Sequence, residues 1–137
     1  MPNPSTLAAQ DEGRLEQKPR NTKIAVVGSR GYPDEDEVRS FIHNLPRGVI
    51  VISGGAKGVD TWAEDQACRE GLEMIIFKPN YELLGPTFAP RARNGQIVAT
   101  ADRMEAFWDG ESPGTIDAIQ KMLNASKPVN VRIKRLT

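Results

Sequence analysis

Residues 48–62, GVIVISGGAKGVDTW, predict a strand, a glycine-rich turn and a helix in direct succession. Val49 to Ile52 is a short β-branched run of the kind found in buried strands. From Gly58 onward apolar residues recur at helical spacing. Glycines let the turn reach positive φ and bring a ligand close to bare N–H groups, and the helix N-terminus adds a partial positive charge. The stretch therefore predicts either a phosphate or carboxylate site or a tight turn without a ligand.

The composition excludes several classes of protein. The 137 residues include 18 basic and 18 acidic side chains, one cysteine and one histidine. A disulfide framework within one chain is therefore excluded, the pattern argues against a zinc site, and we expect neither a metal nor a cofactor. We expect a buried or half-buried thiol at Cys68 and a surface position for His43. Because DNA binding depends on neutralising phosphates, the zero net charge makes nucleic acid an unlikely partner, although a local basic patch stays open.

The distribution of apolar residues gives expectations about location and domains. No run approaches about twenty apolar residues, which predicts no membrane span and no membrane partner. The N-terminus lacks the apolar segment of a signal peptide, so we expect a cytoplasmic protein. Residues 1–22 are rich in proline and polar residues and predict a disordered or loosely packed arm. Residues 23–137 predict one domain with a core of its own.

Strands and helices alternate along the predicted domain. The expected strands are 23–27, 49–52, 74–77, 103–108 and 129–133, and apolar stripes at helical spacing lie between them. This alternation predicts a single Rossmann-like, three-layer α/β domain. We expect a five-stranded, mostly parallel sheet with helices on both faces.

Local signals place the helix ends. Asp34, with Glu37 three residues later, predicts a capping box at the start of the first helix, and Thr115 is the expected cap of the last. Gly71 is expected to end the helix that follows the glycine turn. Gly85 and two prolines make residues 79–90 an expected long loop, with a helix beginning at Pro90.

The polar and glycine residues that depart from the core pattern follow the carboxyl ends of strands. In doubly wound sheets these ends form the ligand site. Three glycine turns that feed three helix N-termini are stronger evidence for a pocket than any one of them. The predicted ligand-binding residues are Gly28, Ser29, Arg30, Ser53, Gly54, Gly55, Ala56, Lys57, Gly58, Asp60, Arg93, Asn94, Asp109, Ser112, Gly114 and Thr115.

The same motifs carry a family resemblance. The segments 28–30, 53–60, 93–94, 106–109 and 112–115 resemble the YspA/YpsA-related branch of the SLOG superfamily, which also contains the LOG phosphoribohydrolases and the DprA/Smf proteins. The resemblance covers residues 23–133. It implies a Rossmann-like nucleotide-binding domain, a nucleotide or ADP-ribose-like ligand and a sensor or signalling role. SLOG relatives commonly pair, which implies a homo-oligomer, with Leu83 and Phe88 as candidate contacts.

The match to the LOG enzymes is incomplete. Their motif places a catalytic glutamate where this chain has Ala118, and the double glycine of that motif is also missing. An N-glycosidic hydrolase therefore stays an alternative, with Asp60, Asp109 and Arg93 as its candidate catalytic residues. DprA-like binding of single-stranded DNA is the second alternative.

Each candidate residue has an expected role. Gly54, Gly55 and Gly58, with Lys57, are expected to cradle a phosphate. Gly114 and Thr115 would form a second contact. The two arginines, Arg30 and Arg93, would clamp phosphate oxygens or, alternatively, form surface salt bridges to residues such as Asp34 or Glu111. The two acidic residues, Asp60 and Asp109, would accept hydrogen bonds from ribose hydroxyls, and Tyr81 is the candidate for stacking on a base.

Overall fold

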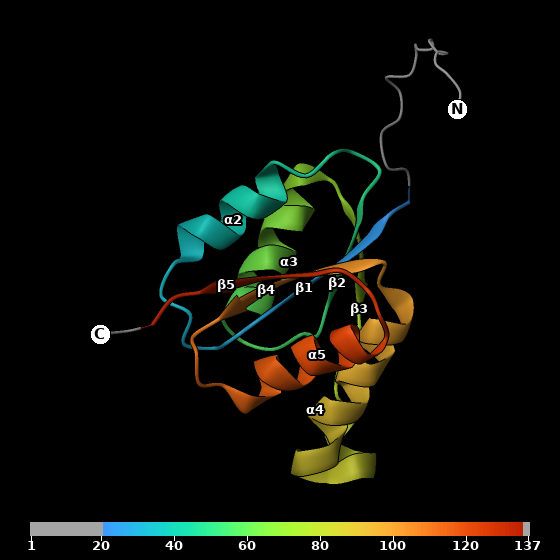
Figure 1. The fold of residues 1–137 in the computed structure, drawn as a ribbon. Helices are drawn as coiled ribbons and strands as arrows, with labels where there is room; N and C mark the ends of the chain where they lie inside the picture. The colour runs from blue at the N-terminus through green and yellow to red at the C-terminus, as the bar shows by residue number, and fades with distance from the viewer. Residues whose placement is uncertain (1–20, 136–137) are drawn as a thin grey trace.

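The computed structural model describes residues 21–135, in which five strands and four helices alternate along the chain (Figure 1). The expectation of an arm over residues 1–22 lies almost wholly outside the described residues. The elements are β1 (Lys23–Gly28), α2 (Glu35–His43), β2 (Ile50–Ser53), α3 (Val59–Glu70), β3 (Glu73–Ile76), α4 (Tyr81–Thr100), β4 (Arg103–Trp108), α5 (Pro113–Asn124) and β5 (Val129–Ile133).

The strands form one parallel sheet in the order β3-β2-β1-β4-β5. From β1 the chain builds outward through β2 to β3, and then returns to the other side of β1 to add β4 and β5. The direction of winding therefore reverses between β1 and β4. This reversal opens a crevice at the carboxyl ends of these strands, where open α/β sheets bind their ligands. The predicted fold class is confirmed.

Each face of the sheet has its own core. Ile24 and Val26 of β1 pack with residues of α2 and α3, whereas Ala25 and Val27 pack with residues of α4 and α5. Helices cover both faces, and this explains why the strand is apolar at every position instead of alternating. Each fully buried aliphatic side chain contributes on the order of 2 kcal/mol to this packing.

The helix ends follow the sequence signals at two of three positions. The Asp34 carboxylate accepts a hydrogen bond from the Glu37 N–H at 3.0 Å, and Gly71 ends α3 in the left-handed region. The prediction for Thr115 is wrong. Ser112 is the N-cap residue of α5, and Pro113 occupies the first turn, because a fixed φ and a missing N–H suit that position. Thr115 therefore lies inside the helix.

The predicted loop over residues 79–90 is also wrong, because helix α4 begins at Tyr81. The Asn80 side chain caps it by accepting a hydrogen bond from the Leu83 N–H at 3.0 Å. Gly85, at φ 79°, interrupts the helix, and Pro86 follows immediately. Proline is tolerated in a first helical turn, so a second segment starts there, and two helical segments meet at a kink.

The structure contradicts the prediction made for Cys68 and confirms the prediction made for His43. Cys68 is exposed, so the prediction of a buried or half-buried thiol is wrong: its position on α3 lies beside the apolar stripe on the solvent side. His43 is at the surface as predicted, with its Nδ1 atom 2.6 Å from a Glu70 carboxylate oxygen.

Candidate functional site

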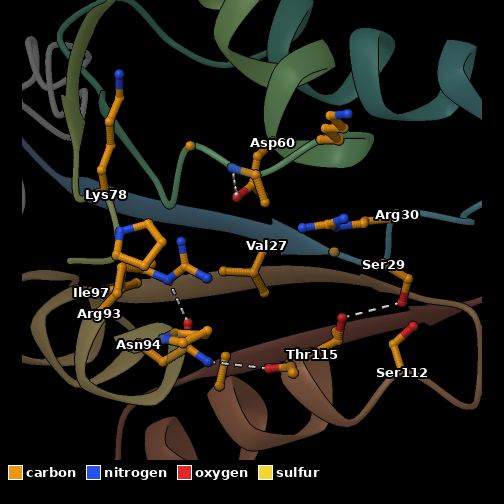
Figure 2. Close-up of a pocket in the computed structure, with 18 of the residues that line it drawn as sticks. Val27, Ser29, Arg30, Asp60, Lys78, Arg93, Asn94, Ile97, Ser112 and Thr115 are labelled. Carbon is orange, nitrogen blue, oxygen red and sulfur yellow. Dashed lines mark hydrogen bonds between the residues drawn. The ribbon is translucent and has the colours of Figure 1, made fainter. Parts of the chain in front are cut away.

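A cavity of about 590 Å³ lies at the carboxyl ends of the central strands, between α3 on one side and α4 and α5 on the other (Figure 2). It lies where the winding direction of the sheet reverses. Its walls are formed by Val27, Gly28, Ser29, Arg30, Gly55, Ala56, Lys57, Asp60, Lys78, Pro79, Tyr81, Pro90, Arg93, Asn94, Ile97, Ser112, Gly114, Thr115 and Ala118.

Most of the predicted site residues line this cavity. The exceptions are Ser53, Gly54, Gly58 and Asp109, which lie behind the wall and support it. Ser53, for example, is fully buried and donates a hydrogen bond to Glu64 at 2.6 Å. The sequence-based list misses Lys78, although its position immediately beyond β3 was a usable signal. It also misses the apolar wall of Val27, Ile97 and Ala118, which looks like ordinary core in the sequence.

The turn between β2 and α3 forms the upper wall. Gly55 and Gly58 have φ values of 69° and 83°, which L side chains rarely adopt. A Cβ atom at Gly58 would also lie 2.8 Å from the backbone oxygen of Arg30. Glycine is therefore required where this turn passes the end of β1. The N-terminus of α3 therefore follows directly on the cavity-lining residues Gly55, Ala56 and Lys57, and a helix N-terminus favours negative charge.

Asp60 holds this turn from the inside. Its Oδ2 atom accepts a hydrogen bond from the Ala56 N–H at 3.1 Å, and the residue is buried. Burial raises the pKa of Asp60 to about 7, against the smaller opposing effects of the Ala56 hydrogen bond and the Arg93 charge. The carboxylate is thus engaged with the protein backbone, where the sequence suggested a contact to ribose.

Asp109 is likewise engaged within its own turn. Its Oδ1 atom accepts hydrogen bonds from the N–H groups of Glu111 and Ser112 at 2.9 and 2.8 Å, and its Oδ2 atom accepts one from the Ser112 hydroxyl. Burial alone would raise the pKa of Asp109, but these hydrogen bonds outweigh it and lower the pKa to about 2. Asp109 therefore shapes the turn before α5 and does not line the cavity.

Arg93 joins α4 to the turn after β2. Its guanidinium donates to the backbone oxygen of Gly54 through Nη1. Through Nε it donates to the Asn94 Oδ1 atom at 3.0 Å (Figure 2). Asn94 in turn donates to the Gly114 backbone oxygen at 3.2 Å and to Asp117 at 3.0 Å. These contacts fix the cavity wall and leave part of the guanidinium facing the cavity.

The end of β1 is tied to α5 by hydroxyl groups. The Ser29 and Thr115 side-chain oxygens lie 3.2 Å apart, and Ser29 also accepts a hydrogen bond from the Asp109 N–H at 3.1 Å. Both hydroxyl-bearing residues are buried. The Thr115 side chain, expected as a helix cap, is used for this contact.

Three exposed cations surround the cavity: Arg30 after β1, Lys57 after β2 and Lys78 after β3. Within residues 21–135 none of them forms an ion pair, and Asp34, one expected partner of Arg30, pairs with Lys134 instead. The cavity therefore carries a local positive charge that the net charge of the chain conceals.

Residues 21–135 contain neither a helix that could cross a membrane nor a cluster of side chains that could hold a metal ion. No helix in residues 21–135 combines the length and the apolar character needed to cross a bilayer. In the same range there is no group of three or more His, Cys, Asp or Glu side chains placed to hold a metal ion.

Comparison with known proteins identifies the family. The family model described as DNA recombination-mediator protein A matches residues 3–80, more than half of the chain. The chain belongs to this family. A relative of known sequence, the Gene 61 protein of Mycobacterium phage D29, is 31% identical over 117 residues, which cover 78% of this chain and 93% of that protein.

Two solved structures have the same fold. DNA processing protein A (DprA) from Streptococcus pneumoniae superposes with a TM-score of 0.71 at 21% identity, over 81% of this chain and 50% of that one. The protein from Helicobacter pylori, whose structure is described by its single-stranded DNA binding mode, superposes with a TM-score of 0.66 at 22% identity, over 92% and 71%. The chain thus spans about half the length of the first of these proteins.

These findings correct the expected partner. The family model is described as a DNA recombination mediator. The structure of the H. pylori protein is described by the way in which that protein binds single-stranded DNA. The expectations that nucleic acid is an unlikely partner and that a small nucleotide-like ligand is the partner are therefore wrong. The physical reason is that the net charge averages over the whole chain. Many acidic side chains lie on α2 and α3 in ion pairs such as Arg39–Asp65, whereas the cations at the cavity have no such partners in residues 21–135.

Proposed function

We propose that the protein binds single-stranded DNA, without reading base sequence, in the cavity at the carboxyl ends of the sheet. The observation that carries this proposal is the set of three exposed cations, Arg30, Lys57 and Lys78, around a glycine turn and a helix N-terminus. Backbone phosphates are the natural ligand of such a site, since both the N–H groups and the cations favour negative charge.

The cavity also suits a single strand better than a duplex. Its volume of about 590 Å³ admits individual nucleotides into a concave site. Tyr81, half exposed at the first position of α4, offers an aromatic ring at the rim. Stacking of unpaired bases on aromatic side chains beside a basic groove is the usual chemistry of single-strand binding.

The contacts of the polar side chains favour binding that is independent of sequence. Asn94, Ser29 and Thr115 are buried and already have hydrogen-bond partners within the protein. Base-edge readout needs side-chain donors and acceptors that are free to pair with bases. The groups left for DNA are the cations Arg30, Lys57 and Lys78, which would contact phosphates.

The geometry favours binding over hydrolysis. Asp60 is engaged with the Ala56 N–H, and Asp109 with its own turn. Ala118 stands where the LOG enzymes have their glutamate. The placement of the chain in the YspA-related branch, and the domain boundary at residue 23, remain proposals that rest on the motifs in the sequence.

Fluorescence anisotropy with fluorescein-labelled dT16 tests this proposal. We expect binding that weakens as salt rises, with a slope of about −0.7 per phosphate neutralised. Replacing Lys57 and Lys78 together by alanine should weaken binding about tenfold or more, because both cations line the cavity. Arg47→Ala is the matched control, since Arg47 is an exposed cation before β2, at the opposite edge of the sheet. An unchanged affinity in the Lys57/Lys78 variant, or no binding by the wild type at about 50 mM salt, would contradict the proposal.

A further inference from the structure

Arg135 follows β5 and lies outside the cavity described above. Its guanidinium lies directly over Gly110, in the turn between β4 and α5: a Cβ atom at Gly110 would meet the Arg135 Nε and Nη2 atoms at 2.6 and 2.9 Å. Gly110 has a φ of 87°, so this turn is built for glycine. The absence of a side chain there lets the guanidinium rest on the turn at the carboxyl edge of the sheet.

Arg135 differs from the other two cations of this part of the chain, Arg132 in β5 and Lys134 just after it. Arg132 pairs with Glu105 at 2.6 Å and with Glu37 at 3.1 Å, and Lys134 pairs with Asp34 at 2.6 Å. Arg135 is exposed and forms no ion pair within residues 21–135. The nearby carboxylate of Asp109 is used by the N–H groups of its own turn. Arg135 therefore presents its charge to solvent.

The position of Arg135 completes a row of cations. In the spatial order of the sheet, Lys78 follows β3, Lys57 follows β2, Arg30 follows β1 and Arg135 follows β5. Figure 1 shows β1, β4 and β5 ending on the same side of the molecule. Only β4 lacks a cation at this edge, and there the Asp109 turn supports Arg135. Adjacent strands lie about 4.8 Å apart, so the row spans about 19 Å.

We propose that Arg135 forms the outer end of a DNA track that crosses the carboxyl ends of all five strands, from Lys78 to Arg135. This inference rests on the proposed function and extends its site beyond the cavity. A span of about 19 Å corresponds to about six nucleotides at the 3.4 Å rise of a stacked strand, and to fewer in an extended one. Arg135 therefore contributes to the binding affinity only of oligonucleotides that are long enough to cross from the cavity to the end of β5.

The test compares the binding of a long oligonucleotide, dT16, with that of a short one, dT3. Labelled dT16 is titrated at several salt concentrations against wild type, Arg135→Ala, Arg135→Lys and the control Arg47→Ala. Affinity for unlabelled dT3 is measured by its displacement of labelled dT16. The two neighbouring phosphates of dT3 cannot span the distance of about 19 Å from Lys78 to Arg135, so dT3 bound at the cations that follow β3 and β2 does not reach Arg135.

We expect Arg135→Ala to weaken dT16 binding about threefold or more and to reduce the salt slope by about 0.7, while dT3 binding is unchanged. Arg135→Lys should keep the salt slope, and Arg47→Ala should behave as wild type. If Arg135→Ala binds dT16 as wild type does while the Lys57/Lys78 variant is weakened, the track is overturned and the cavity proposal stands. Equal weakening of dT3 and dT16 would also overturn the track. If the wild type binds neither strand, the proposed function itself fails.

Discussion

The Asp60 carboxylate and the backbone N–H of Ala56 lie 3.1 Å apart, and this hydrogen bond closes the glycine turn over a buried acid. The same burial disfavours the charged form of the carboxylate, which is why the pKa of Asp60 rises from 3.8 to about 7. The turn that forms the proposed phosphate site is therefore held by a group whose charge changes near neutral pH.

This shift predicts a pH dependence of stability. Between about pH 4 and 7 the folded protein keeps the Asp60 proton while the unfolded chain has lost it, so the free energy of unfolding contributed by this group falls as pH rises. Below pH 4 and above pH 7 the contribution is constant. The fall is on the order of a few kcal/mol, since each unit of pKa difference corresponds to about 1.4 kcal/mol.

Urea unfolding of wild type and Asp60→Asn, measured from pH 5 to 8, checks this prediction. The neutral amide keeps an oxygen that can accept the Ala56 hydrogen bond, so the difference in stability between variant and wild type should shift in favour of the variant as pH rises. Other titrating groups cancel in this difference. A difference that does not change with pH would contradict the raised pKa.

A second prediction concerns the two glycines Gly58 and Gly95. Gly58→Ala places a Cβ atom 2.8 Å from the Arg30 backbone oxygen at a φ of 83°, and should cost at least about 1–2 kcal/mol and weaken DNA binding. Gly95 lies in α4, where a Cβ atom would meet nothing within 4 Å. Gly95→Ala should stabilise the protein by about 0.5–1 kcal/mol, since alanine favours helix. The unfolding temperatures of both variants, compared with that of the wild type, separate backbone strain at Gly58 from helix propensity at Gly95. Equal changes in the two unfolding temperatures would refute this account.

A third prediction concerns Arg132, which lies against the rings of Phe41 and Phe107 with its guanidinium 5.3 and 5.2 Å from their centres. It pairs with Glu105, which is only 4% exposed. Arg132→Ala leaves this buried carboxylate with the Asn130 amide as its remaining side-chain partner within residues 21–135, so we expect a loss of about 3–5 kcal/mol in the free energy of unfolding.

The double variant Arg132→Met with Glu105→Gln removes both charges of this pair and keeps apolar contact with the rings. It should cost clearly less than Arg132→Ala alone, because no buried charge is left without its cation. Urea unfolding of both variants at pH 7 measures the difference. A double variant that is as unstable as Arg132→Ala would mean that packing, and not charge, governs this site.

A feature could be predicted from the sequence when the residues that determine it lie close together along the chain, and was missed when they lie far apart. Strands and turns were predictable because β-branched runs and glycines act locally, and the topology then brings strand ends such as Ser29 and Lys57 to one edge. The start of α4 was missed because Gly85 and Pro86 look like loop residues, whereas Asn80 supplies a cap. Contacts such as Arg93 to Gly54, 39 residues apart, have no local signal. The partner was missed because a sum over 36 charges says nothing about where they lie.

The last prediction concerns Tyr81, whose ring is half exposed at the rim of the cavity. If a DNA base stacks on this ring, Tyr81→Ala should weaken dT16 binding by about 1–3 kcal/mol, whereas Tyr81→Phe, which keeps the ring, should bind nearly as wild type. Both variants should unfold close to the wild-type temperature, because the side chain contributes little buried area. Phe88→Ala is the matched control, since Phe88 is an exposed aromatic residue of the same helix outside the cavity wall. Equal losses in Tyr81→Ala and Phe88→Ala would place the bases along the outer face of α4, whereas no loss in either would leave phosphate contacts as the basis of binding.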